Sequence, residues 1–262
     1  MDLELHGKLA LVSASSGGIG EEIATVLAEE GAEVIVNGRT EASVEKALGR
    51  IRARVPDARL APLASDLGTQ EGTERAIRDF PVVDILVNNL GVYEPVGFLD
   101  SSDDQWFRLF EINVMSGVRL SRHYLKPMLA KNAGRIVFIA SEAAVTPAPE
   151  LPHYSATKSM ELSVSRILAE QTAGTRVTVN TVMPGSTRTE GVRQFIQELF
   201  PDLSYDDAER RFMADNRPTS LIQRLIDPRE VADFVAFVCS GRSGAINGSA
   251  LRADGGIVRS VF

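Results

Sequence analysis

The stretch LALVSASSGGIGEEIATVLAEE, residues 9–30, joins an apolar run to an amphipathic run through a glycine-rich turn. It predicts a strand at Leu9–Ser13 and a helix at Ile19–Glu30. Glycines let a backbone approach a phosphate closely, and a helix start offers unpaired N–H groups and a positive dipole end. Such a turn also occurs as a plain tight connection, but its place after a first strand favours phosphate binding. We expect the contacts to come from Ser13, Ser15, Ser16, Gly18, Ile19 and Gly20.

The same alternation of short apolar runs and longer amphipathic runs continues along the chain. The further predicted strands are Glu33–Asn37, Arg59–Ala64, Asp84–Asn88, Arg135–Ala140, Arg176–Val182 and Ser249–Arg252. The further predicted helices are Ser43–Val55, Gln70–Phe80, Asp104–Lys131, His153–Gln171 and Arg229–Ser240. Consecutive apolar residues within the strands are typical of a parallel sheet that is covered on both faces. The pattern therefore predicts an α/β fold: a single doubly wound Rossmann-type domain over residues 1–262, with a seven-stranded parallel sheet and helices on both faces. A long polar excursion at about 186–226 is expected to form a substrate lid.

Composition excludes several classes of function. The net charge of −7 argues against a nucleic-acid partner. No apolar run is long enough to cross a bilayer, and the acidic start lacks the features of a signal peptide, so we expect a cytoplasmic protein with no membrane partner. The single cysteine, Cys239, excludes an internal disulfide framework and is expected to be a buried, inert thiol. Three scattered histidines without cysteine partners predict no metal site.

The residues at the ends of the later strands predict which dinucleotide is bound. A site for NAD uses a carboxylate after the second strand, whereas here the strand ends in Val36-Asn37-Gly38 and Arg39 follows. An arginine there could hold a 2′-phosphate, so NADP(H) is favoured over NAD(H); a solvated surface charge is the alternative interpretation of Arg39. The other candidate cofactor contacts are Asp66, Leu67, Asn89, Gly91, Pro184, Gly185, Thr187 and Thr189.

Three further residues can assemble an acid–base site. Tyr154 and Lys158 are four residues apart on a predicted helix, which places them on one face, and Ser141 lies thirteen residues before the tyrosine. An ammonium group near a phenol lowers the pKa of the phenol from its usual value of about 10, and a nearby hydroxyl can hold a substrate oxygen. Singly, such residues are usually surface or turn residues, so the prediction depends on the set.

Together these motifs resemble the short-chain dehydrogenase/reductase family, in its single-domain branch of roughly 250 residues. The glycine motif falls on Ser13 to Gly20, with Ala14 in place of the first glycine, and an Asn-Asn-Ala-Gly segment falls on Asn88 to Gly91, with Leu90 as a departure. The resemblance implies catalytic roles for Asn113, Ser141, Tyr154 and Lys158. It implies that Asn113 positions a relay water, which requires a local disruption of the helix around it. It also implies a homotetramer.

Three functions follow as alternatives. The first is an NADP-dependent oxidoreductase that interconverts a carbonyl and an alcohol, resembling a 3-oxoacyl-carrier-protein reductase and acting on a small molecule. The second is an NAD-dependent alcohol dehydrogenase. The third is a dinucleotide-binding sensor without turnover, against which the presence of Ser141, Tyr154 and Lys158 counts.

Overall fold

The computed structural model describes residues 1–261, and across them one parallel sheet of seven strands has the order β3-β2-β1-β4-β5-β6-β7. The strands are β1 (Leu9–Val12), β2 (Glu33–Gly38), β3 (Arg59–Ala64), β4 (Ile85–Asn88), β5 (Gly134–Ile139), β6 (Val177–Pro184) and β7 (Ala250–Ala253). The order reverses between β1 and β4, and ligands of open α/β sheets bind beyond the strand ends at such a point. The predicted fold class is confirmed. Phe262, the last residue of the predicted domain, lies outside the described residues.

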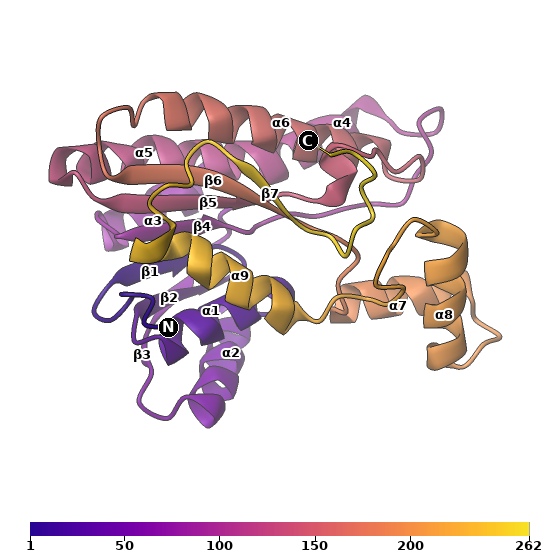
Figure 1. The fold of residues 1–262 in the computed structure, drawn as a ribbon. Coiled ribbons are helices and arrows are strands. Elements are labelled where there is room, and N and C mark those ends of the chain that lie inside the picture. Colours follow the sequence, from indigo (N-terminus) through magenta and orange to yellow (C-terminus); the bar gives the residue numbers. More distant parts are fainter. Residues whose placement is uncertain (262) are drawn as a thin grey trace.

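Helices cover both faces of the sheet (Figure 1). One face carries α1 (Gly18–Glu29), α2 (Glu41–Arg54) and α9 (Pro228–Cys239); the other carries α3 (Gln70–Asp79), α4 (Asp103–Leu109), α5 (Ser116–Lys131) and α6 (Pro152–Glu170). Successive strand residues point to opposite faces, so Val12 packs with the first group of helices and Leu11 with the second. This is why the strands are apolar at consecutive positions.

Two short helices between β6 and α9 stand apart from the layers, beyond the carboxyl end of the sheet (Figure 1). They are α7 (Glu190–Leu199) and α8 (Tyr205–Asn216). Thr189 and Ser204 cap their first turns by accepting from backbone N–H groups. Ile196, Ala208 and Phe212 form a small apolar cluster that holds the two helices together.

The predicted element bounds differ from the structure by no more than two residues, with one exception. The helix predicted at 104–131 is not continuous: a π-helical turn at Phe110–Met115 separates α4 from α5. Asn113 lies in that turn, as the resemblance implied. Its side-chain amide oxygen accepts from the Val92 N–H, and its NH₂ group donates to the Val92 carbonyl and, at 3.0 Å, to Thr157 Oγ1. Among the described helices, none is long and apolar enough to cross a membrane.

Candidate active site

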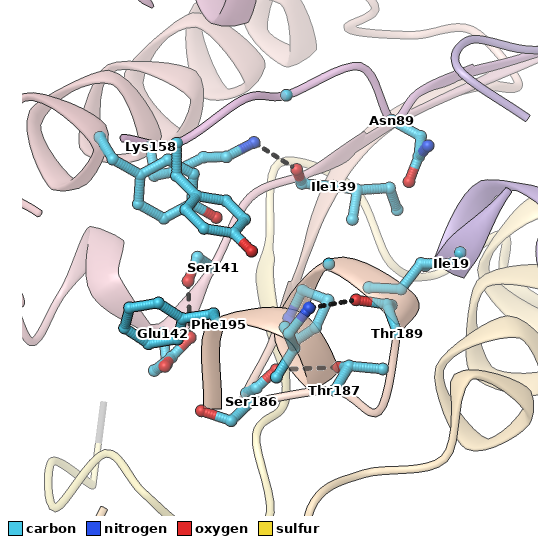
Figure 2. Close-up of a pocket in the computed structure, with 18 of the residues that line it drawn as sticks. Ile19, Asn89, Ile139, Ser141, Glu142, Lys158, Ser186, Thr187, Thr189 and Phe195 are labelled. Atoms are coloured by element: carbon cyan, nitrogen blue, oxygen red, sulfur yellow. Dashed lines mark hydrogen bonds between the residues drawn. The ribbon is translucent and has the colours of Figure 1, made fainter. Parts of the chain in front are cut away.

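A cavity of about 390 Å³ lies beyond the carboxyl ends of β1, β4, β5 and β6 (Figure 2). Three of the four predicted catalytic residues line it: Ser141, Tyr154 and Lys158. The predicted cofactor residues that line it are Gly18, Ile19, Gly20, Asn89, Gly91, Pro184, Gly185, Thr187 and Thr189. The catalytic and cofactor predictions therefore meet in one place.

The glycine-rich turn has the shape of an anion-binding helix start. Helix α1 begins at Gly18, whose φ of +57° is a conformation that suits glycine. A side chain at Gly20 would lie 2.5 Å from the carbonyl oxygen of Ala14, so only glycine lets the loop fold back on the helix. No side chain of residues 1–261 caps this helix. The first N–H groups of α1 are thus left for a ligand, and the site fits a dinucleotide phosphate.

Two of the predicted contacts have side chains that hold the loop together instead. The Ser13 hydroxyl accepts from the N–H groups of Asn89 and Leu90, at 2.8 and 2.9 Å. The Ser15 hydroxyl donates to the Val12 carbonyl at 2.7 Å and accepts from the Asn37 N–H at 2.8 Å. Neither residue lines the cavity. Because both hydroxyls are buried and bonded internally, they act on the cofactor site through the loop that they shape.

Four other predicted cofactor contacts lie outside the cavity. Arg39 directly follows β2 and is exposed, and no hydrogen bond or ion pair of its side chain is found within the described part of the chain. Asp66 is also exposed and accepts from the Gly68 N–H at 3.0 Å, while Thr69, and not Asp66, caps α3. Leu67 is buried in the apolar core. The backbone carbonyl of Ser16 accepts a hydrogen bond from the Arg50 guanidinium. Arg39 is therefore free to meet an anion, whereas the Leu67 side chain is not available.

Thr187 and Thr189, two of the predicted cofactor contacts, follow β6. The Thr187 hydroxyl donates to the Gly185 carbonyl at 2.9 Å, and Thr189 caps α7. Gly185 packs against the strand end next to it, since a side chain there would lie 2.7 Å from the Asp254 carbonyl oxygen. These contacts position the backbone between β6 and α7 along the cavity.

The Tyr154, Lys158 and Ser141 side chains converge on the cavity from two elements. Tyr154 and Lys158 lie on α6, and the Lys158 ammonium is 5.7 Å from the centroid of the Tyr154 ring. Ser141 follows β5 and caps a 3-10 turn at Glu142–Ala144. Figure 2 shows its hydroxyl directed to the Glu142 carboxylate, to which it donates at 2.6 Å. The opposite wall is aromatic: the rings of Tyr93 and Tyr154 meet edge to face at 6.1 Å, and Phe195 packs on Tyr93.

The electrostatics of Tyr154 differ from the expectation. The structure does not show the predicted lowering: burial, followed by the Glu142 carboxylate and then by Glu161, raises the pKa of Tyr154 well above its usual value. A smaller contribution comes from the surroundings of the lysine, whose ammonium donates to the Ile139 carbonyl at 2.8 Å and to the Glu161 carboxylate at 2.9 Å. A carboxylate beside the ammonium offsets the positive charge that was expected to act on the phenol.

Glu142 adds a second buried carboxylate to the site. Only 7% of its surface is exposed, and its nearest cation is Arg217, which reaches it from beyond α8 at 3.5 Å. Burial raises the pKa of Glu142, and Ser141 and Arg217 oppose that change. The cavity therefore has a polar wall at Glu142 and Arg217 and an apolar wall at Tyr93 and Phe195.

Two predictions about other residues can be compared directly with the structure. Cys239 is buried in α9, and burial raises the pKa of its thiol to about 12, as expected for an inert cysteine. Within residues 1–261 no cluster of metal-ligating side chains is found.

Asn113 does not line the cavity but contacts Thr157, on the α6 turn between Tyr154 and Lys158. Glu161 was missed, although an acid three residues after Lys158 on the same helix was a usable signal.

Comparison with known proteins agrees with this geometry. Residues 8–199 match the family model described as short chain dehydrogenase. The uncharacterized oxidoreductase YvaG of Bacillus subtilis is 58% identical over the whole of both chains. The 3-oxoacyl-[acyl-carrier-protein] reductase FabG of Vibrio harveyi is 32% identical over 97% of this chain and 99% of its own. The structure is similar to that of L-sorbose reductase from Gluconobacter frateurii complexed with NADPH and L-sorbose, with a TM-score of 0.93, 31% identity and full coverage of both chains.

Proposed function

Because the chain belongs to the short-chain dehydrogenase/reductase family and is an NAD(P)-dependent oxidoreductase, we propose that it interconverts a carbonyl compound and an alcohol with NADP(H), using Tyr154 as the acid or base. One observation carries the proposal. Ser141, Tyr154 and Lys158 line the same cavity as the glycine-rich start of α1, so a proton donor lies beside a site that fits a dinucleotide.

The roles of the side chains follow from their positions. Bound cofactor supplies the hydride, and Gly18, Gly20 and Gly91 give it close backbone contact. In reduction, the Tyr154 phenol gives its proton to the carbonyl oxygen as the hydride reaches the carbon; in oxidation, both transfers run in reverse. Ser141 holds the same oxygen, for which its hydroxyl must turn from Glu142 toward the cavity. Lys158 holds the cofactor ribose, and Asn113 positions a water that returns protons to the lysine.

The preference for NADP(H) rests on Arg39. Its guanidinium is exposed at the end of β2 and is bound to nothing else within residues 1–261, as a clamp for a 2′-phosphate requires. The L-sorbose reductase structure that this chain resembles contains NADPH, which agrees with this choice. NAD-dependent oxidation of an alcohol is the alternative, with the same Tyr154 acting as a base.

Dissociation constants of NADPH and NADH, from fluorescence titration, test the cofactor preference. We expect Arg39→Asp to weaken NADPH at least tenfold and to leave NADH nearly unchanged, since only NADPH carries the 2′-phosphate. Arg52→Asp is the matched control, because Arg52 is an exposed arginine on the following helix. Equal losses for both cofactors would contradict the clamp.

Turnover separates an enzyme from a sensor. With NADPH and a panel of carbonyl compounds that includes L-sorbose and 3-oxoacyl thioesters, we expect Tyr154→Phe to reduce kcat by about 10²–10⁴-fold. NADPH binding should persist, because the ring remains. Tyr205→Phe, on α8, is the control. An unchanged rate in Tyr154→Phe would exclude this mechanism.

We also propose that residues 186–226 form a substrate lid on the single domain, and that the protein is a cytoplasmic homotetramer. Two of the residues that line the cavity, Phe195 and Arg217, belong to the lid segment, which supports a role in substrate selection. Phe107 on α4 and Ile167 on α6 are 69% and 63% exposed. Exposed apolar side chains of this size are typical of a surface that a second subunit covers, which supports the tetramer. Light scattering after size-exclusion chromatography measures the mass and tests the tetramer.

A further inference from the structure

Glu161 lies one helical turn after Lys158 on α6, and the two side chains form a buried ion pair. Each is only 3% exposed. Both carboxylate oxygens of Glu161 accept from the Lys158 ammonium, at 2.9 and 3.1 Å. On another side the ammonium donates to the Ile139 carbonyl, a bond drawn in Figure 2. Gly91 closes a further side, since a side chain there would lie 3.1 Å from Nζ.

We propose that Glu161 is a positioning residue that sets the acid strength of Tyr154 by holding Lys158 in place and offsetting its charge. This inference rests on the proposed function, in which Tyr154 gives or takes the proton. Glu161 does not line the cavity, so it acts through Lys158 and not on the substrate.

The count of ammonium hydrogens supports the positioning role. An ammonium has three N–H donors. One goes to Ile139 and at least one to Glu161, which leaves no more than one for the cavity. That remaining donor has a fixed direction, because the other two partners belong to a strand end and to the helix itself. A lysine without Glu161 would be free to rotate about its last bonds.

Charge is the second part of the argument. Titratable or charged groups reach Tyr154 from four parts of the fold. Helix α6 brings Lys158 and Glu161, and the turn after β5 brings Glu142. The loop after β4 brings Tyr93, and Arg217, just after α8, acts through its contact with Glu142. Lys158 is the cation that α6 places beside the Tyr154 ring, and Glu161 is bonded to it. Burial and Glu142 are the largest causes that raise the pKa of Tyr154, and Glu161 adds to them. Burial also raises the pKa of Glu161 to about 7, so its full charge acts on the phenol above that pH.

The consequence concerns the protonation state of Tyr154. A phenol with a raised pKa keeps its proton at neutral pH but gives it up less readily, because a general acid works best with a pKa near the operating pH. A Lys158 without its carboxylate partner would favour the phenolate, which accepts a proton from an alcohol. Glu161 therefore favours the protonated form of Tyr154.

Ionisation of Tyr154 without any substrate tests the proposal. Tyrosinate absorbance is titrated in each Glu161 variant and in the same variant carrying Tyr154→Phe, and the difference isolates Tyr154 from Tyr93, Tyr124 and Tyr205. We expect Glu161→Gln to move the onset of Tyr154 ionisation to lower pH by about one unit, the effect of removing one charge within two turns of the same helix. Glu170→Gln, an exposed change at the end of α6, should leave it in place.

A second neutral variant makes the result decisive. Glu161→Asn, which is neutral and keeps an oxygen acceptor at this position, is titrated in the same way and replaces Glu161→Gln if that variant does not fold, as judged by near-ultraviolet circular dichroism. An unchanged onset, or a shift to higher pH, in the folded neutral variant would overturn the proposal and leave the pair with a structural role only. The titration needs no turnover, so its failure is distinct from failure of the proposed function, which would appear as an unchanged rate in Tyr154→Phe.

Discussion

Breaking the Lys158–Glu161 pair should cost far more stability than removing it. Both side chains are 3% exposed, so Lys158→Met leaves a buried carboxylate and Glu161→Met leaves a buried ammonium. A buried pair that loses one partner costs about 3–5 kcal/mol, whereas replacement of both by apolar groups of similar volume is often neutral or stabilising. The Ile139 carbonyl loses its donor in either variant that removes Lys158, which adds about 1–3 kcal/mol.

The expected free energies of unfolding follow from these contributions. Relative to the natural sequence, we expect Glu161→Met to lose about 3–5 kcal/mol, Lys158→Met about 4–8 kcal/mol, and the double variant only about 1–3 kcal/mol. The double variant should then be more stable than either single one. Urea unfolding followed by circular dichroism measures all four proteins, and equal slopes against urea concentration show that the comparison is valid.

A matched pair on the same helix is the control. Arg166 and Glu170 also form an ion pair on α6, but their side chains are 62% and 60% exposed. Replacing either or both should change the unfolding free energy by no more than about 0.5–1 kcal/mol, because water solvates the remaining charge. If the losses at Lys158 and Glu161 simply added, to within about 0.5 kcal/mol, the reasoning about a coupled buried pair would be refuted.

Three other predictions concern the rest of the chain. Ala14 has a φ of +51°, so Ala14→Gly should relieve backbone strain and raise the unfolding free energy by about 1 kcal/mol, measured by urea unfolding; a loss of stability would contradict it. Asp84 accepts from the Leu9 N–H and from Lys131, which together hold the pKa of its carboxyl below the usual range although burial opposes them. Asp84→Asn should therefore cost about 1 kcal/mol at neutral pH, and the cost should disappear as pH falls through that depressed pKa; a cost independent of pH in acid unfolding curves would exclude the explanation. Cys239 should react with thiol reagents only as the protein unfolds, because burial raises its thiol pKa to about 12; fast labelling of the native protein would be inconsistent with the structure.

Local patterns in the sequence were sufficient to predict the fold and the meeting of Ser141, Tyr154 and Lys158 in one cavity. Consecutive apolar residues in Leu9–Val12 and Ile85–Asn88 require cover on both faces of a strand. The glycines at Gly17–Gly20 permit the tight turn from strand to helix, with Gly18 at a positive φ. Tyr154 and Lys158 had to share a helix face, because their spacing of four residues is a helical turn. Even the disruption around Asn113 followed from a motif, and the structure contains it as a π-helical turn.

Only the tertiary structure decided which groups balance those residues. Ser141 donates to its neighbour Glu142, and Glu142 contacts Arg217, which is more than seventy positions away in the sequence. The Ser13 hydroxyl, after β1, accepts from the N–H of Asn89, which follows β4. The pKa of Tyr154 is raised and not lowered, because it depends on burial and on two carboxylates that α6 and β5 bring to it. Sequence spacing specifies the geometry within one element, whereas desolvation and charge depend on every element that packs around a group. That is why the sequence predicts that Ser141, Tyr154 and Lys158 come together, whereas the direction of the pKa shift of Tyr154 required the structure.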